Sequence, residues 1–224
     1  MTNQHPEIIF IEGVCGTGKS TLVRELSALL SSFSIPELPE FNRHILLPYE
    51  NSENIRDNFS TNLKCEIIRE HILGANTFES ATFIFDRSYF SLMALSQGFK
   101  DYLPIKFRIE LIKEIKNKIL NGELYCPNKI LCLMSSHDTT MKRNNEKTKN
   151  LSDLWTSYDR FARQEKVYNF FGNLNIIHLI DAEDNISLVC NKCLHIIKHT
   201  KNLTKDQLIE SLDLYEKWVI SNER

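Results

Sequence analysis

The stretch IIFIEGVCGTGKSTLVRELSALL, residues 8–30, joins an apolar run, a glycine-rich turn and a helix-like segment. The run Ile8–Ile11 is apolar at every position, which indicates a strand buried on both faces. The segment that begins at Lys19 has a helical pattern, so the turn connects the end of a strand to the start of a helix. This order of elements predicts an α/β fold.

The turn itself, Gly13-x4-Gly18-Lys19-Ser20, satisfies the P-loop formula at every required position. Its glycines let successive backbone N–H groups turn toward phosphate oxygens. Lys19 adds positive charge near the β- and γ-phosphates, and Ser20 offers a hydroxyl group to Mg²⁺. We therefore predict a nucleotide-binding loop made of Gly13, Gly16, Thr17, Gly18, Lys19, Ser20 and Thr21.

The nucleotide held by this loop is predicted to be ATP, with Mg²⁺. GTP-binding switch proteins usually carry an Asn-Lys-x-Asp sequence that recognises guanine. Asn-Lys pairs occur at Asn117, Asn128 and Asn191, and all of them lack the aspartate. ATP is therefore the better candidate for the phosphate donor.

The composition limits the partners of the protein. The formal net charge of −2 over 224 residues gives no general attraction to nucleic acid or to an anionic membrane, which favours a small-molecule partner. No apolar run approaches the roughly 20 residues that span a bilayer. The six cysteines are scattered, and no segment resembles a secretory signal, so we expect a soluble, cytoplasmic protein with reduced thiols.

Short apolar runs alternate with longer helical segments along the chain, which predicts a parallel sheet. The strands are expected at residues 8–11, 34–38, 82–85, 129–134 and 175–180. The helices are expected at residues 19–33, 58–73, 88–96, 105–120, 153–171, 185–199 and 204–220. We interpret residues 1–200 as one domain and residues 201–224 as a C-terminal helical extension, which Thr204-x-x-Gln207 opens in the form of a capping box.

The third predicted strand ends in the sequence Asp86-Arg87-Ser88. In a parallel sheet, ligands gather at the carboxyl ends of the strands, so Asp86 and Arg87 are expected to face the phosphate loop. Asp86 is a candidate to help hold Mg²⁺. Arg87 is a candidate to neutralise the charge that develops between donor and acceptor.

Together, these segments resemble the thymidylate kinase and deoxynucleoside kinase group of P-loop kinases. The resemblance is carried by EG-x4-GKST at residues 12–21, DRS at 86–88, SLMALSQGF at 91–99 and IDA at 180–182. It implies a five-stranded parallel sheet flanked by helices on both faces, and phosphoryl transfer from ATP to a nucleoside or nucleotide. This kinase group is often dimeric, so the resemblance leaves a homodimer open.

The sequence carries features of both branches of this group. Asp86 agrees with the thymidylate branch, whose acceptor is a nucleoside monophosphate. Gln97 agrees with it as well, because residues 95–98 come close to the A-x-Q-G stretch of that branch. The thymidylate-type loop Arg-Glu-Pro-Gly-Gly is absent after the second strand, where Glu37 and Glu40 stand in Pro-Glu sequences instead. In the deoxynucleoside branch, a glutamate at this place accepts the proton of the sugar hydroxyl. Glu40 is preferred for this role because it lies further past the apolar run.

The choice of acceptor therefore depends on a few charged residues. A hydroxyl acceptor needs a carboxylate such as Glu40, whereas a monophosphate acceptor needs an arginine cradle, for which Arg43 and Arg69 are the candidates beside Arg87 and Gln97. We expect transfer to a nucleoside monophosphate, with a nucleoside or another hydroxyl compound as the alternative. A nucleotide-binding regulatory protein without turnover is the third possibility.

A polar tract at about residues 136–151 follows the fourth predicted strand, where the kinase group carries an arginine-bearing lid. In MKRNNEKTK, residues 141–149, Arg143 and Lys147 are four apart and share a helical face, so both are predicted to reach the γ-phosphate. A lysine at the second position departs from the usual Arg-x-x-x-Arg and loses bidentate geometry while keeping the charge.

Overall fold

The computed structural model describes residues 6–36, 52–74, 81–147 and 157–223. Its centre is a five-stranded sheet with the strand order β2-β3-β1-β4-β5, in which every pair of neighbours is parallel. The strands are β1 (Glu7–Gly13), β2 (Phe33–Ile35), β3 (Thr82–Asp86), β4 (Lys129–Met134) and β5 (His178–Asp181). The predicted five-stranded parallel sheet is thereby confirmed.

The central strand β1 aligns the residues of the site. It pairs with β3 up to Ile11 opposite Asp86, and with β4 up to Gly13 opposite Leu133. The carboxyl ends of β1, β3 and β4 therefore meet at one edge of the sheet. From β1 the chain continues to β2 on one side of the sheet, and from β3 it continues to β4 on the other side. Ligands of α/β proteins bind at the carboxyl edge where the connections diverge in this way.

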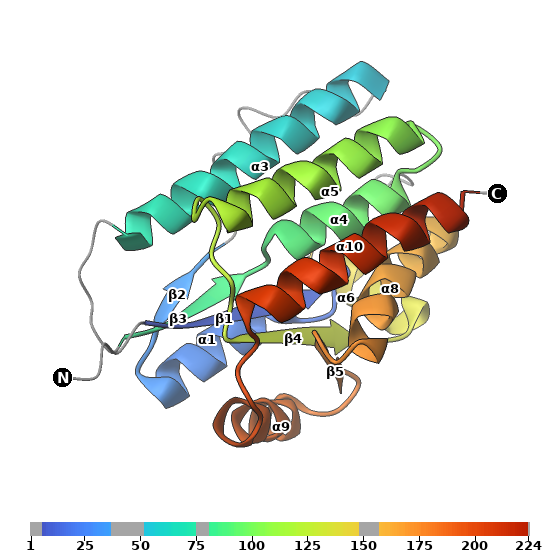
Figure 1. Ribbon diagram of the computed structural model, residues 1–224. Coiled ribbons are helices and arrows are strands. Elements are labelled where there is room, and N and C mark those ends of the chain that lie inside the picture. The colour runs from blue at the N-terminus through green and yellow to red at the C-terminus, as the bar shows by residue number, and fades with distance from the viewer. Residues whose placement is uncertain (1–5, 37–51, 75–80, 148–156, 224) are drawn as a thin grey trace.

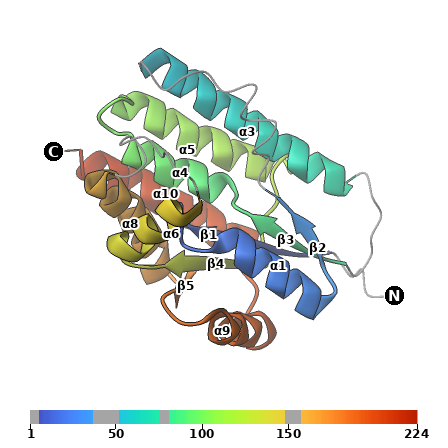
Figure 2. The same ribbon diagram turned by 180° about the vertical axis from the view of Figure 1, so that it is seen from behind.

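Helices cover both faces of the sheet (Figures 1 and 2). One face is covered by α1 (Lys19–Leu30) and α9 (Ile186–His199), whose buried side chains form one core with the sheet. The other face carries α3 (Ser52–Gly74), α4 (Tyr89–Gly98), α5 (Ile105–Leu120), α8 (Tyr158–Asn173) and α10 (Lys205–Ser221). The helix α6 (His137–Lys147) follows β4 at the carboxyl edge of the sheet.

The C-terminal helix α10 packs on the body of the protein. Its buried side chains Leu208, Leu212, Tyr215 and Val219 belong to the same core cluster as α4, α5 and α8. The capping box at its start is confirmed, since Thr204 Oγ1 accepts from Gln207 N at 3.2 Å and Gln207 Oε1 accepts from Thr204 N at 3.0 Å. The sequence predicts α10 as a C-terminal extension, but its apolar face forms part of the core.

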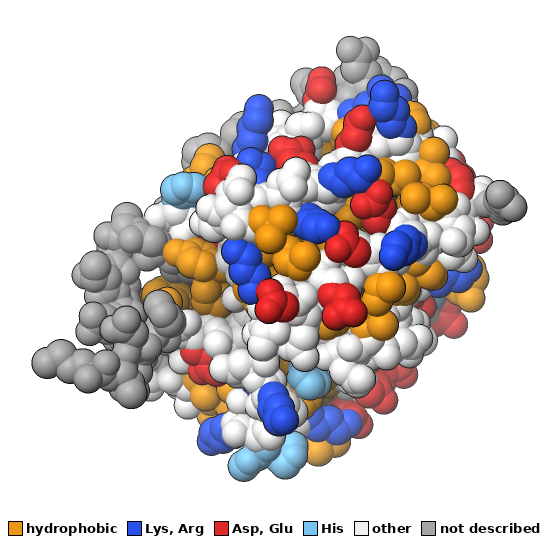
Figure 3. All heavy atoms as spheres, viewed as in Figure 1, with side chains coloured by type: hydrophobic (Ala, Val, Ile, Leu, Met, Phe, Trp, Pro, Cys, Tyr) orange, Lys and Arg blue, Asp and Glu red, His pale blue; other side chains and the backbone are white. Residues whose placement is uncertain are grey.

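Ion pairs join α10 to α5 at the surface. Lys113 lies 3.3 Å from Glu216, and Lys116 pairs with Asp213. On the face seen in Figure 3, basic and acidic side chains are interspersed with apolar ones. This mixture agrees with a net charge close to zero. None of the helices that the structure describes is long and apolar enough to cross a membrane.

The bounds of several elements differ from the predicted ones. The helix α1 ends at Leu30, three residues before its predicted end, because Ser31 adopts a left-handed conformation, with φ of 49°. The strand β2 begins at Phe33, one residue before its predicted start. Residues 37 and 38 of the predicted strand lie outside the described part of the chain. The strand β5 begins at His178 and not at residue 175, because Asn175 turns the chain with φ of 57°.

Candidate active site

The loop between β1 and α1 is wrapped around the side chain of Lys19. Lys19 is 5% exposed, and its Nζ donates to the carbonyl oxygens of Gly13 at 2.9 Å and Val14 at 2.7 Å. Gly13 has φ of 136°, and a Cβ atom there would lie 2.5 Å from Leu133 O on β4. The close contact with β4 therefore requires glycine at this position, and the loop has the compact shape that its sequence predicts.

The helix α6 lies directly on this loop. Asn144 is buried, and a Cβ atom on Gly16 would lie 2.7 Å from Asn144 Oδ1. Asn144 Nδ2 also donates to Cys15 O at 3.4 Å. The polar tract after β4 thus forms a helix over residues 137–147, with one face packed on the phosphate loop. Ser136 starts this helix, because its Oγ accepts from Thr139 N at 3.3 Å.

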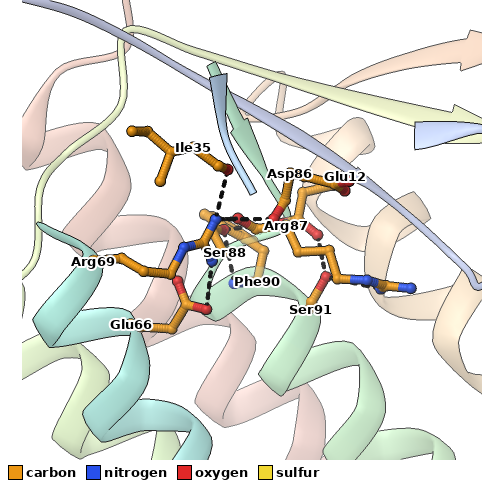
Figure 4. Close-up of polar contacts among 9 residues, drawn as sticks. All are labelled: Glu12, Ile35, Glu66, Arg69, Asp86, Arg87, Ser88, Phe90 and Ser91. Carbon is orange, nitrogen blue, oxygen red and sulfur yellow. Dashed lines mark hydrogen bonds and ion pairs between the residues drawn. The ribbon is translucent and has the colours of Figure 1, made fainter. Parts of the chain in front are cut away.

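The carboxylate of Glu12, the last side chain before the glycine loop, is completely buried. It accepts hydrogen bonds from Ser88 Oγ at 2.5 Å and from Ser91 Oγ at 2.6 Å (Figure 4). It also accepts a hydrogen bond from the Tyr168 hydroxyl at 3.3 Å. Burial raises the pKa of Glu12, while the two serine hydroxyls, and beyond them the charges of Arg87 and Lys19, lower it. Glu12 therefore ties the end of β1 to α4 and α8.

The turn after β3 places Asp86 and Arg87 beside the phosphate loop. Arg87 has φ of 65°, an uncommon value for a residue with a side chain, and its backbone N donates to Ile11 O at 2.9 Å. Its Nη1 donates to Ser91 Oγ at 3.3 Å and to Gly13 O at 3.4 Å. The guanidinium group of Arg87 is thus close to the first residue of the loop, on the side where the phosphates are expected.

Asp86 is 7% exposed, and its Oδ1 is buried without a hydrogen-bond partner among the residues that the structure describes. A buried carboxylate oxygen of this kind is costly unless a cation or water satisfies it. Carboxylate and hydroxyl oxygens are ligands that Mg²⁺ accepts, and Ser20 lies exposed in the first turn of α1. The donor set of Asp86 and Ser20 therefore fits Mg²⁺.

Arg69 on α3 points into the protein. It is 2% exposed, and its Nη1 binds Glu66 Oε1 at 2.8 Å. Its Nη2 donates to carbonyl oxygens at the ends of β2 and β3, at 3.1 Å to Ile35, 2.9 Å to Asp86 and 3.3 Å to Arg87 (Figure 4). Arg69 therefore holds together the two strand ends and the turn that carries Arg87.

Gln97 lies near the other end of α4. It is 5% exposed and accepts a hydrogen bond from Arg108 of α5, which in turn binds Glu223 near the C-terminus. Eight residues of helix separate Gln97 from Tyr89, the first residue of α4, and this corresponds to a distance of about 12 Å along the axis. The amide of Gln97 thus joins α4, α5 and the end of α10.

Arg143 of α6 borders a cavity of about 240 Å³ that opens at the start of α1. The cavity is also lined by Thr17, Gly18, Ala182, Asp184 and Val189. Arg143 Nη2 donates to Ala182 O at 2.9 Å and Nη1 donates to Thr17 O at 3.4 Å. Arg143 therefore links α6 both to the phosphate loop and to the segment between β5 and α9.

The other predicted residues are distributed as follows. Glu40, Arg43 and the side chain of Lys147 lie outside the described part of the protein. Glu12 and Asn144 were not among the predicted residues of the site. A carboxylate at the end of an otherwise apolar strand was the available signal for Glu12. Nothing in the polar tract distinguished Asn144 from its neighbours.

The sequence matches no protein-family model and no curated protein. Among solved structures, it is similar to deoxyadenosine kinase from M. mycoides with dCMP and dCDP bound, with 18% identity, a TM-score of 0.68 and coverage of 86% of this chain and 100% of that chain. Thymidylate kinase from Candida albicans is 19% identical, with a TM-score of 0.59 and coverage of 86% and 91%.

A third similar structure is the NadR protein in complex with NR, which is 13% identical with a TM-score of 0.63. The match covers 89% of this chain and 53% of that chain. The chain described here therefore has the fold of the P-loop nucleoside and nucleotide kinases.

Proposed function

We propose that the protein is a kinase that transfers the γ-phosphoryl group of ATP to a small nucleoside or nucleotide. The observation that carries this proposal is the arrangement of two turns at one edge of the sheet. The loop around Lys19 and the turn of Asp86 and Arg87 are held together by Glu12, Ser88 and Ser91. This arrangement supports a site made of a phosphate-binding loop, a cation-binding carboxylate and a guanidinium group.

In this proposal, the backbone N–H groups of the loop and Lys19 hold the β- and γ-phosphates. Ser20 and Asp86 would hold Mg²⁺, which would neutralise phosphate charge. Arg87 stabilises the charge on the transferring group from the acceptor side. Arg143 and α6 close the donor cavity, and this closure limits the access of water to the phosphoryl group.

Between the two types of acceptor, the contacts of Arg69 favour a nucleoside hydroxyl. A monophosphate acceptor needs arginines that are able to turn toward its phosphate, and Arg69 uses both Nη atoms inside the protein. In the preferred reaction, the 5′-oxygen of the sugar bonds to the γ-phosphorus and its proton passes to Glu40. The bond from the γ-phosphorus to the bridging oxygen breaks, and ADP leaves with the electron pair.

A nucleoside monophosphate is the second candidate. The sequence Asp86-Arg87 and the likeness to a thymidylate kinase support it, and Arg43 with Arg87 would then hold the acceptor phosphate. Transfer to a monophosphate needs no carboxylate base, because the acceptor oxygen is already anionic. The two candidates therefore differ in their need for Glu40.

An assay of ADP release against a panel of nucleosides and nucleoside monophosphates tests the proposal. We expect turnover with at least one nucleoside, abolished in Lys19→Ala and reduced on the order of 10²-fold in Glu40→Gln. Turnover only with monophosphates, unaffected by Glu40→Gln, would establish the second candidate. ATP binding in calorimetry without transfer to any acceptor would refute the kinase and point to a regulatory protein.

A further inference from the structure

A second polar cavity, of about 200 Å³, lies near the amino ends of β4 and β5. It is bordered by Asn128, Lys129 and His178 and by the link between α9 and α10, with Thr200, Lys201 and Asn202. Figure 1 shows this link passing the amino end of β4. Lys129 precedes Leu133, the strand partner of Gly13, by four residues, or about 13 Å of extended chain, so the cavity is separate from the kinase site.

Lys129 is buried at this cavity, and none of the described carboxylates forms an ion pair with it. It is 1% exposed, and its Nζ donates to Thr200 O at 2.6 Å. Thr200 ends α9, so the negative end of the helix dipole stabilises the ammonium group in part. Two N–H groups of the ammonium remain for other acceptors. No carboxylate among the described residues forms an ion pair with Lys129, and Glu7 only partly offsets the effect of burial, which lowers the pKa of Lys129.

The remaining lining of the cavity offers hydrogen-bond donors. Asn128 Oδ1 accepts from Ile8 N at 2.7 Å, so the side chain of Asn128 has its NH₂ group left to donate. His178 is half-buried, and burial and the nearby Lys129 lower its pKa. Lys201 adds a charge at the exposed rim, and α10 begins close by with the positive end of its dipole. Among the residues that the structure describes, no aspartate or glutamate lines the cavity.

Size limits the ligand. A water molecule takes about 30 Å³ of liquid volume, so the cavity corresponds to six or seven waters. Cavities for larger ligands have about 300 Å³ or more. The space thus admits a single phosphate group.

We propose that this cavity binds one phosphate group, held by the ammonium of Lys129, the amide of Asn128 and the ring of His178, with Lys201 at the rim. The bound dianion supplies the negative charge that the buried ammonium lacks. It also ties the link between α9 and α10 to the sheet.

The ring of His178 reports on this cavity, so the test follows its NMR signal in the full-length protein. The signal is assigned with His178→Gln. Inorganic phosphate is titrated at constant ionic strength against chloride, and a second titration uses methyl phosphate. We expect a saturable shift of the His178 signal and a rise of its pKa, because the anion favours the protonated ring. A response to inorganic phosphate alone identifies free phosphate, and a response to both identifies any phosphate monoester small enough to enter.

The same titration with Lys19→Ala separates the two phosphate sites. We expect an unchanged response of His178 in that variant, since the kinase loop lies at the other edge of the sheet. Lys201→Met, at an exposed position, should weaken binding by about two- to threefold, and Lys129→Met by about tenfold or more. Lys198→Met is the matched control on the exposed side of α9 and should leave the affinity unchanged.

Lys129→Met removes the buried hydrogen bond from Lys129 Nζ to Thr200 O, so the folding of that variant is checked first by circular dichroism. Lys201→Met keeps the test decisive if Lys129→Met fails to fold. The proposal is wrong if phosphate leaves the His178 signal of the wild-type protein unmoved. It is equally wrong if the shift of this signal disappears in Lys19→Ala, because the effect would then come from the kinase loop.

Discussion

Glu12 and Ser91 are joined by a hydrogen bond of 2.6 Å that connects the end of β1 to the first turn of α4. The same Ser91 hydroxyl accepts from Arg87 Nη1 at 3.3 Å, so the buried carboxylate orients the guanidinium group through one serine. The described hydrogen bonds of the Glu12 carboxylate go to Ser88, Ser91 and Tyr168. We therefore propose that Glu12 is a positioning residue, whose effect on catalysis passes through Ser91 and Arg87.

We predict that Glu12→Gln lowers kcat on the order of 10²-fold, because the amide cannot accept from all three hydroxyls and the Arg87 turn shifts. The KM for ATP should change much less, since Lys19 is untouched. Steady-state kinetics measure both constants. Tyr168→Phe removes only the longest of the three bonds and serves as the control, with less than a tenfold loss expected. Equal losses in the two variants would contradict the positioning role.

Two glycines of the phosphate loop should differ in their response to alanine. At Gly13 a Cβ atom meets Leu133 O at 2.5 Å, whereas at Gly18, with φ of 99°, it meets no atom within 4 Å. Gly18→Ala therefore suffers only the strain of the left-handed backbone, about 1–2 kcal/mol. Gly13→Ala adds steric overlap and should be less stable by about a further 1–3 kcal/mol in denaturant unfolding. Similar stabilities of the two variants would show that β4 moves away without cost.

Removal of the Arg143 side chain should weaken the binding of the phosphate donor. Arg143→Ala eliminates the bonds to Ala182 O and Thr17 O, which hold α6 on the loop. A charged hydrogen bond contributes about 1.5–3 kcal/mol, so we expect the KM for ATP to rise by about tenfold or more, with faster hydrolysis of ATP in the absence of acceptor. Lys142→Ala, an exposed neighbour, is the control. An equal rise of KM in both variants would mean that general charge, and not this contact, matters.

Stability should depend on pH through Glu70, a buried residue of α3. Burial raises the pKa of Glu70 to about 9, although a bond from Tyr125 N opposes this shift. The folded protein therefore keeps a proton that the unfolded chain releases above its ordinary pKa near 4.5. The free energy of unfolding should thus fall as the pH rises between about 4.5 and 9.

Glu70→Gln mimics the protonated carboxyl group and should remove this slope. The stability gained by the variant over the wild type should grow by up to about 1.4 kcal/mol per pH unit inside the window. The difference in unfolding free energy between the variant and the wild type is measured by denaturant unfolding at about pH 5, 7 and 8.5. Glu114→Gln, at an exposed position of α5, is the control and should leave the slope unchanged. A constant difference across the window would show that Glu70 is ionised in the folded protein.

Much of the fold was predictable from the sequence because its signals are local. The apolar run before Gly13, the glycine spacing and the helical pattern after Lys19 lie within 23 consecutive residues. The five strands follow from similar short runs, and α10 from a capping box that the structure contains. The bounds of β2 and β5 were less accurate, since left-handed turns at Ser31 and Asn175 leave no mark in hydrophobicity.

The sequence alone determined the donor side of the site, because a phosphate loop is built from neighbouring residues whose backbone does the binding. Tertiary structure decided how the charged side chains around it are used. Arg69 and Gln97 belong to motifs, yet burial and contacts with distant carbonyls and Arg108 give them partners inside the protein. Glu12 acquires its role from hydroxyls 76 and more residues away. Residue type sets what a side chain is able to do, and packing sets which partner it reaches.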